Sequence, residues 1–234
     1  MFIDRRRLLS MAAAAGSGLF AGAAPTRADA QGSDQWFPIT GDDGKPVANL
    51  RQPVELISEV EALPGTIRVG SKQADAAIIE FYDYNCPFCR KAARDVKDLL
   101  AADRGLRLGL VSNPILSPQS KDAAKVELAV LKLRGSKVAY EFHERLFRVP
   151  GRIDGEKAIG VATAIGLERG ELVRATSHAE VLAAIEDQLR LAASMGLAAT
   201  PSFLIGGAGV LGYPGPKALA RMIGSERKCG AVTC

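Results

Sequence analysis

The sequence predicts an α/β fold in which a small sheet is interrupted by a block of helices. A nearly continuous apolar run over residues 76–84 predicts a strand buried on both faces. A helix predicted from Pro87 to about Ala102 and a strand predicted over residues 106–111 complete a strand–helix–strand unit of parallel type. Helical periodicity then continues to Met195, and two short strands and a helix follow. The expected order is therefore strand–helix–strand, a helical insertion at about 117–196, and strand–strand–helix.

Glycines and prolines divide the helical pattern of the insertion into segments. The last of these helices carries its apolar residues at three- and four-residue spacing, as expected for a helix with one buried face. The predicted helices of the insertion cover residues 120–133, 137–147, 154–165, 168–176 and about 181–195; strands are predicted at 202–205 and 210–212, and a closing helix at 216–223.

Residues 31–64 precede this core and are predicted to form an N-terminal arm or small hairpin that ends in a short helix. The apolar side of that helix is expected to comprise Leu56, Val60 and Leu63. A short edge strand is predicted at 66–69. The main domain is assigned to residues 65–224, and residues 225–234 to a cysteine-bearing C-terminal tail.

The N-terminal 30 residues have the pattern of a removable export signal. Arg5–Arg7 open a weakly apolar run from Leu8 to Ala24, and the small-x-small pattern Ala28-Asp29-Ala30 follows. An uncleaved anchor is the alternative, but the run is rich in Gly and Ser for a transmembrane helix. Paired arginines before paired leucines favour the twin-arginine route, although a general secretory signal has a similar pattern. We expect cleavage after Ala30 and a periplasmic protein.

Charge and cysteine content narrow the class of protein. The formal net charge is +4, from 30 basic and 26 acidic residues, and four of the arginines lie in the predicted leader. The remainder is close to neutral, which gives a nucleic-acid partner no electrostatic support. All four cysteines lie outside the leader, and an even number fits two disulfides in an oxidising compartment.

Cys86 and Cys89 are spaced to form a redox-active pair at the start of the predicted helix. Unpaired backbone amides and the helix dipole would stabilise a thiolate at Cys86. Pro87 suits the first helical position, and Cys89, one turn later, is placed to attack a mixed disulfide at Cys86. The alternatives are an inert disulfide and a zinc knuckle, but no further ligands stand at knuckle spacing and we expect no metal.

Glu80 stands within the apolar strand, six residues before Cys86. A carboxylate on a strand buried on both faces is costly unless it has a task. With a raised pKa, it could pass protons to or from Cys89. The alternative is a charge at a strand edge that faces water.

Pro201 stands at the start of a predicted core strand, a position where proline is tolerated. If the Thr200–Pro201 bond were cis, the backbone there could lie beside the cysteines and pair with a substrate segment as an extra strand. Taken alone, it is an ordinary proline at the start of a strand.

The segment from Glu80 to Cys89, with Phe142-His143 and the segment from Gly196 to Phe203, resembles the DsbA-like thioredoxin-fold family of bacterial envelope oxidoreductases. The resemblance covers about residues 66–223. It implies a thioredoxin-like fold with an inserted helical domain and no cofactor. It also implies a nucleophile at Cys86, a buried partner at Cys89, a proton-relaying carboxylate at Glu80 and a cis proline at Pro201, preceded by Thr200.

Phe88 departs from the pattern of the strong oxidases, which carry His at this position. Phe88 cannot stabilise a thiolate as a polar neighbour would, so we expect a less oxidising pair. Thr before the cis proline also occurs among isomerase-like members, including ScsC-like proteins, which tend to oligomerise through N-terminal segments. Residues 31–64 could serve that purpose here.

The sequence thus favours a dithiol oxidase of exported proteins with cysteine pairs, served by a membrane or periplasmic redox partner. Residues 87, 88, 200 and 201 are expected to contact the substrate. A disulfide isomerase or reductase is the close rival. A Cu(I)-binding protein that uses the two cysteines as soft ligands is a different class, without a Met-rich stretch to support it. A noncatalytic binding module is a further alternative.

Cys229 and Cys234 lie outside the family pattern. Five residues apart, they can close a small structural disulfide loop. An auxiliary pair that exchanges with Cys86, a metal site or free thiols are the alternatives. His143 lies on an apolar helix face and is expected to be a packed or hydrogen-bonded core residue.

Overall fold

The computed structural model describes residues 36–234. The signal peptide predicted at residues 1–30 therefore lies outside the described residues, as do the first residues of the predicted arm. Within residues 36–234, no helix is both long and apolar enough to cross a membrane.

A six-stranded mixed sheet forms the centre of this part of the chain, with the order β1-β6-β5-β3-β4-β2. Neighbouring β3 and β4 are parallel, as the crossover through α2 requires, and the other pairs are antiparallel. The strands are β1 (Asn49–Arg51), β2 (Ile67–Gly70), β3 (Ala76–Tyr82), β4 (Leu106–Ser112), β5 (Ser202–Ile205) and β6 (Ala208–Leu211).

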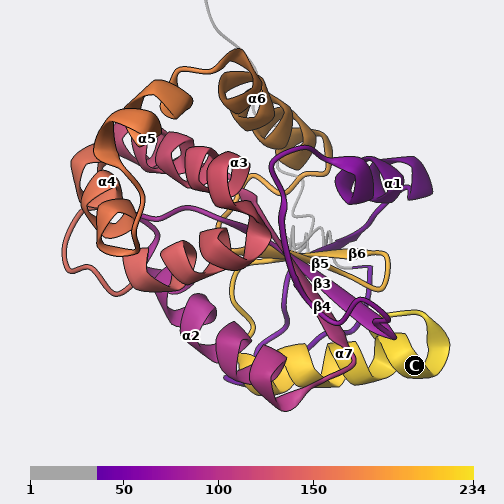
Figure 1. Ribbon diagram of the computed structural model, residues 1–234. Coiled ribbons are helices and arrows are strands. Elements are labelled where there is room, and N and C mark those ends of the chain that lie inside the picture. The colour runs from indigo at the N-terminus through magenta and orange to yellow at the C-terminus, as the bar shows by residue number, and fades with distance from the viewer. Residues whose placement is uncertain (1–35) are drawn as a thin grey trace, which may run out of the picture. The chain divides into compact units, whose positions relative to one another are not determined.

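Helices cover both faces of the sheet and form the insertion, which emerges between β4 and β5 (Figure 1). They are α1 (Val54–Ala62), α2 (Pro87–Ala102), α3 (Pro118–Leu146), α4 (Gly155–Ala164), α5 (Arg169–Thr176), α6 (Ala179–Ser194) and α7 (Pro216–Cys229). The first insertion helix bends at Gly135, whose φ of 76° is not helical, as the sequence predicted from that glycine.

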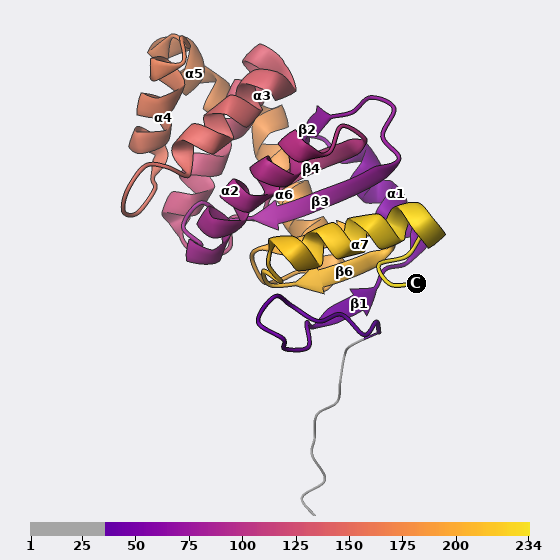
Figure 2. The same ribbon diagram turned by 90° about the horizontal axis from the view of Figure 1, so that it is seen from below.

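Alternation along β3 separates two apolar layers. Ile78 and Tyr82 face the layer that contains α2 and α7, whereas Ile79 and Phe81 face the layer of α1 and α6. Figure 2 shows α7 running alongside the sheet on the same side as α2. Glu80 has the parity of Ile78 and Tyr82, and therefore points toward α2.

The N-terminal segment agrees only in part with the predicted arm or small hairpin and short helix. A small hairpin is present, with a bridge between Thr40 and Pro46, and α1 buries Val60 as expected. However, residues 49–51 form the edge strand β1, paired with β6 of the same chain. A three-residue strand whose partner lies about 160 positions later has too little local pattern to be recognised.

Two predicted boundaries near the C-terminus were wrong. The β6 strand begins at Ala208 rather than Val210, because Gly206 and Gly207 adopt positive φ angles and form a two-residue hairpin that pairs Ile205 with Ala208. The closing helix continues to Cys229 rather than ending at Ile223, so Cys229 lies in the last turn of α7 and not on a free tail.

Candidate active site

The active-site loop connects the end of β3 to the start of α2. Cys86 is the N-cap residue of α2, with extended φ and ψ angles of −83° and 119°, and Pro87 occupies the first helical turn. The backbone N–H of Cys86 donates to the carbonyl oxygen of Asp83 at 3.0 Å, which closes the turn. The cysteines are both free and both buried in this structure, the reduced form of the pair.

Strand pairing brings the Thr200–Pro201 segment beside Cys86. Because β5 runs antiparallel to β3, with Ser202 opposite Phe81, the residues before β5 lie at the end of the sheet where α2 begins. The Thr200–Pro201 peptide bond is cis, and the Cys86 thiol donates to the carbonyl oxygen of Thr200 at 3.1 Å.

Hydrogen bonding lowers the pKa of Cys86 from 9.0 to about 6. The largest contribution is the hydrogen bond from the Cys89 thiol to the Cys86 sulfur, and the backbone N–H groups of residues 88 and 89 and the Thr200 side chain add to it. Burial opposes the shift but is outweighed. Phe88 contributes its backbone N–H, and its ring is 63% exposed. The low pKa of Cys86 therefore does not need a polar side chain at position 88.

Cys89 has the opposite environment. It is fully buried, and burial raises the pKa of its thiol well above the usual range, with further contributions from Cys86 and the charge of Glu80. The two sulfurs therefore suit different roles. Cys86 ionises readily, as a nucleophile must, whereas Cys89 is a leaving group that needs a proton when it is released.

Glu80 lies in the middle of β3, opposite Leu110 of β4 and Phe203 of β5. Its side chain is fully buried, and neither carboxylate oxygen has a hydrogen-bond partner among residues 36–234. Burial, and secondarily the charge of Cys86, raises the pKa of Glu80 from 4.5 to about 8. The alternative of a strand-edge charge facing water is therefore excluded, and the carboxyl holds a proton at neutral pH close to Cys89.

A buried hydrogen-bond network that holds the active-site loop was not predicted from the sequence. Asp83 is buried and accepts hydrogen bonds from the backbone N–H groups of Asn85 and Leu116 and from the hydroxyl of Ser120. Asn85 in turn exchanges hydrogen bonds with the backbone of Ile153, at 2.7 and 2.9 Å. These contacts fasten the active-site loop to the insertion. Apart from the contact between Asp83 and the N–H of Asn85, they join residues distant in sequence, so no local pattern could reveal them.

A second buried polar group was also missed. Glu127 of α3 accepts hydrogen bonds from the hydroxyls of Tyr82 and Tyr84, one on each carboxylate oxygen. His143 lies 3.4 Å from both Glu127 and the Tyr84 hydroxyl, and is 2% exposed, as predicted for a hydrogen-bonded core residue. Burial, and then the charge of Glu127, raises the pKa of both tyrosines, so the two phenols remain protonated donors.

Two cavities lie at the active-site loop: Cys86 lines one, and the Thr200–Pro201 segment that contacts Cys86 lines the other. One, of about 410 Å³, is lined by Cys86, Arg90 and Arg152, together with Leu116 and polar residues of the loops. The other, of about 360 Å³, is lined by Phe88, Thr200 and Pro201, and by the N-terminal hairpin and the segment from Leu211 to Pro214. The expected substrate-contacting residues line these two cavities: Pro87 lines the first, and Phe88, Thr200 and the buried Pro201 line the second.

Within the described part of the chain, no group of three or more His, Cys, Asp and Glu side chains is placed to hold a metal ion. A buried cysteine pair at a helix start, beside a cis proline and above a protonated carboxyl, is the arrangement that thiol–disulfide exchange needs.

Comparison with known families agrees with this site. The family described as DSBA-like thioredoxin domain matches residues 77–224, which include both cysteines, Glu80 and Pro201. The chain belongs to this family. It is a thiol–disulfide oxidoreductase of the DsbA type, a class of proteins that act on cysteine-containing proteins and redox partners. No curated protein matches the chain.

Solved structures of DsbA-like proteins are similar to this chain over most of its length. A thioredoxin-like oxidoreductase from Silicibacter pomeroyi DSS-3 is 32% identical, with a TM-score of 0.68, over 74% of this chain and 98% of that chain. The thiol-disulfide exchange protein alpha-DsbA2 from Wolbachia pipientis shares the fold at 20% identity, with a TM-score of 0.67, over 74% of this chain and 92% of its own. The catalytic domain of Proteus mirabilis ScsC does so at 21% identity, with a TM-score of 0.65, over 74% of this chain and 97% of its own.

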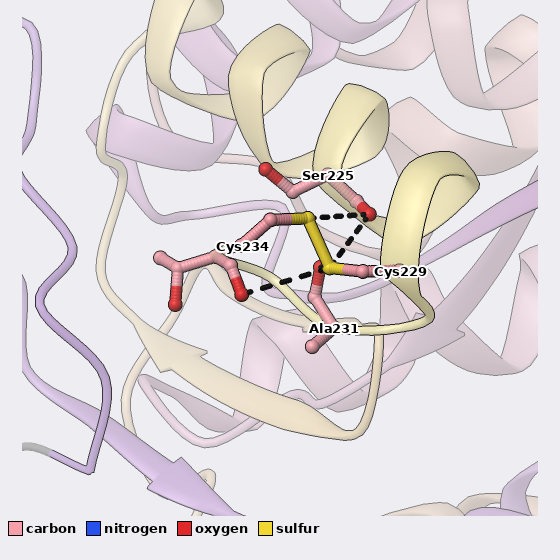
Figure 3. Close-up of a disulfide and its surroundings, with 5 residues drawn as sticks. Ser225, Cys229, Ala231 and Cys234 are labelled. Atoms are coloured by element: carbon pink, nitrogen blue, oxygen red, sulfur yellow. Dashed lines mark hydrogen bonds between the residues drawn. A yellow bond between two sulfur atoms is a disulfide. The ribbon is translucent and has the colours of Figure 1, made fainter.

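The second cysteine pair lies beyond the segment that matches the DsbA-like family. Figure 3 shows the disulfide that joins Cys229, in the last turn of α7, to Cys234, with both sulfurs near the carbonyl oxygen of Ser225. The loop that it closes places Val232 in the core, 2% exposed, against the backbone of Gly206. The α7 helix begins beside the Pro201 cavity, and its last turn lies roughly 20 Å further along, so this disulfide is remote from Cys86.

We expect the Cys229–Cys234 disulfide to stabilise the fold by about 2 kcal/mol, because it closes a loop of few residues that seats Val232. The test is denaturant unfolding of a Cys86→Ser/Cys89→Ser variant, in which this disulfide is the one that a reductant can break. Reductant should lower its midpoint to that of the variant lacking all four cysteines. An unchanged midpoint would show that the tail packs equally well without the covalent link.

Proposed function

We propose that this protein is an exported dithiol oxidase, which forms disulfides in periplasmic proteins through the pair Cys86–Cys89. The low pKa of Cys86 carries the proposal. A thiolate that is stable at neutral pH favours the reduced form of the pair, and a pair that prefers to be reduced is a good oxidant of other thiols. Export rests on the predicted signal at residues 1–30, and one of the solved structures with this fold is that of a periplasmic thioredoxin-like protein from Salmonella enterica.

The reaction begins with the oxidised pair. A client thiolate attacks the Cys86 sulfur, the Cys86–Cys89 bond breaks, and Cys89 leaves with the bond's electron pair. Since Cys89 is buried and strongly prefers the thiol form, it takes up a proton, and Glu80 is the nearby acid with a pKa of about 8 that can supply it. The second client thiolate then attacks the client sulfur of the mixed disulfide and releases Cys86 as a thiolate. The client dithiol has lost two electrons, and the pair has gained them.

The Thr200–Pro201 segment supports binding of an extended client. It borders the open cavity beside Phe88, and its backbone already lies within hydrogen-bonding distance of Cys86. A client strand that lies along it would bring its cysteine to the Cys86 sulfur. In the reduced protein, the Thr200 carbonyl accepts from the Cys86 thiol; when the thiolate forms, the Thr200 side chain and the α2 amides stabilise the charge.

The experiment is oxidation of a reduced peptide that carries two cysteines, by the oxidised mature protein. We expect stoichiometric formation of the peptide disulfide by the wild-type protein, and loss of at least 100-fold in rate for Cys86→Ser, as for removal of a nucleophile. The C-terminal double variant Cys229→Ser/Cys234→Ser is the matched control and should keep the wild-type rate. Absence of peptide oxidation, together with recovery of scrambled ribonuclease, would instead assign the protein as an isomerase.

A further inference from the structure

We infer that the cavity on the insertion side of Cys86 binds an acidic residue adjacent to the client's reactive cysteine. This inference rests on the proposed function and names the class of client segment that the site prefers. Its basis is an unbalanced positive charge at one of the two cavities that flank the reactive sulfur.

Arginine is the only charged residue type that lines this cavity, within the part of the chain that the structure describes. The cavity has a volume of about 410 Å³, and its charged lining residues are Arg90 and Arg152; the remainder are Asn85, Cys86, Pro87, Leu116, Ser117 and Gly151. A carboxylate entering beside Cys86 would therefore meet two guanidinium groups and no competing acid. Guanidinium groups suit carboxylate binding because their N–H groups can form paired hydrogen bonds with both oxygens.

Neither arginine forms an ion pair among the described residues. The Arg90 side chain donates to the carbonyl oxygens of Phe147 and Val149, which hold the group in place without neutralising its charge. The exposed Arg152 side chain has no hydrogen-bond or salt-bridge partner within residues 36–234. Several arginines elsewhere in the fold are paired with carboxylates: Arg145 with Glu141, Arg169 with Glu156, Arg190 with Glu59 and Arg227 with Asp103.

The positive surface continues away from Cys86 along the junction of α2 and α3. A neighbouring cavity of about 250 Å³ shares Arg90 with the first and adds Arg94, Lys97 and Arg148. Glu144 is the one acidic residue that lines it, and it lies 3.1 Å from Lys97 and 4.0 Å from Arg148. Asp98 of α2 is exposed nearby but does not line either cavity. An acidic stretch of client could thus follow Arg152, Arg90 and Arg148 in turn.

The second cavity, beside the Thr200–Pro201 segment, has a different chemistry. The cavity beside Pro201 is lined by Phe88, Val47, Leu211 and Tyr213, and its charged residues, Asp43 and Lys45, are a pair 3.9 Å apart. A client strand seated on the Thr200–Pro201 segment would place one flank of its cysteine in each cavity. The preference for acid should therefore apply to one flank only, with an apolar residue favoured on the other.

The test compares oxidation rates of dithiol peptides that carry Asp, Ser or Lys on either flank of the first cysteine. Each rate is divided by the peptide's rate with a free small-molecule disulfide at the same pH, because flanking charge alters thiol reactivity. We expect the Asp peptide of one orientation to react about 10-fold faster than its Lys counterpart at low salt. That ratio should approach one at about 1 M salt, where screening reaches roughly 3 Å.

The double variant Arg148→Glu/Arg152→Glu should reverse the preference for the acidic peptide. The matched control is Lys72→Glu/Lys137→Glu, which changes the net charge by the same amount at exposed sites outside both cavities. This control should keep the preference of the wild type. Peptides oxidised at rates independent of flanking charge would overturn the inference and leave the proposed function standing. A preference that both double variants lose would assign the effect to net charge rather than to this cavity, and would also overturn it. Failure to oxidise any peptide would overturn both.

Discussion

Replacing Glu80 by Gln is expected to make the reduced protein more stable than the wild type at alkaline pH. The folded protein raises the pKa of Glu80 from 4.5 to about 8, so it binds this proton more tightly than the unfolded chain does. The stability that the proton contributes is complete below pH 4.5 and is lost as the pH rises through 8. That loss is on the order of 5 kcal/mol, and the neutral Gln, of nearly the same shape, does not undergo it.

Denaturant unfolding of the two reduced proteins between pH 5 and about 9 measures the difference, because titrating groups that do not interact with Glu80 contribute equally to both. The Cys86→Ser background is the control: burial is the larger cause of the shift, so the difference should persist there. If the stabilities of the wild type and Glu80→Gln changed with pH in the same way, the Glu80 carboxyl would titrate normally. It could not then serve as the acid for Cys89.

Glu80→Gln should lower the rate of the exchange reaction, although it raises stability at alkaline pH. Gln cannot give a proton to Cys89, so we expect release of Cys89 from the oxidised pair to slow by roughly 100-fold at neutral pH. The gain in stability and the loss in rate together distinguish a proton-transferring carboxyl from one that merely fills space.

Glu80 could be found from the sequence because its environment is local. A lone acid within the run Ile78–Tyr82 is anomalous by itself, since its neighbours in the chain already require the strand to be buried on both faces. The same holds for the cysteine pair and the helix start, where Cys86 and Pro87 occupy positions defined by capping geometry. The order of elements followed from the same kind of short-range pattern.

Features that depend on distant residues could not be found in this way. The position of Thr200–Pro201 beside Cys86 follows from the pairing of β5 with β3, and the sequence suggested it only through resemblance to a family. The strand β1 and the hydrogen bonds of Asp83 likewise depend on partners far along the chain. Glu127 was missed because a glutamate on an amphipathic helix is ordinarily solvated, and the burial of both faces of α3 is decided by tertiary packing.

Glu127→Leu is therefore expected to be among the most destabilising single substitutions, at about 3 to 5 kcal/mol. It removes the acceptor of two buried tyrosine hydroxyls, and each hydroxyl left without a partner costs about 1–3 kcal/mol. Chemical unfolding at neutral pH measures the loss. An exposed glutamate such as Glu156, which forms a surface ion pair with Arg169, is the control and should lose less than about 1 kcal/mol when replaced by Leu.

The triple variant Tyr82→Phe/Tyr84→Phe/Glu127→Leu separates unmet hydrogen bonding from loss of packing. Since removal of both hydroxyls together with their acceptor leaves no hydroxyl unpaired, most of the lost stability should return. A triple variant as unstable as the single one would instead mean that the charged carboxylate itself, with His143, holds α3 against the sheet. Tyr82 and Tyr84 flank Asp83, whose carbonyl oxygen holds the N–H of Cys86. We therefore expect Glu127→Leu also to raise the pKa of Cys86 and the triple variant to restore it, which the thiolate's ultraviolet absorbance reports.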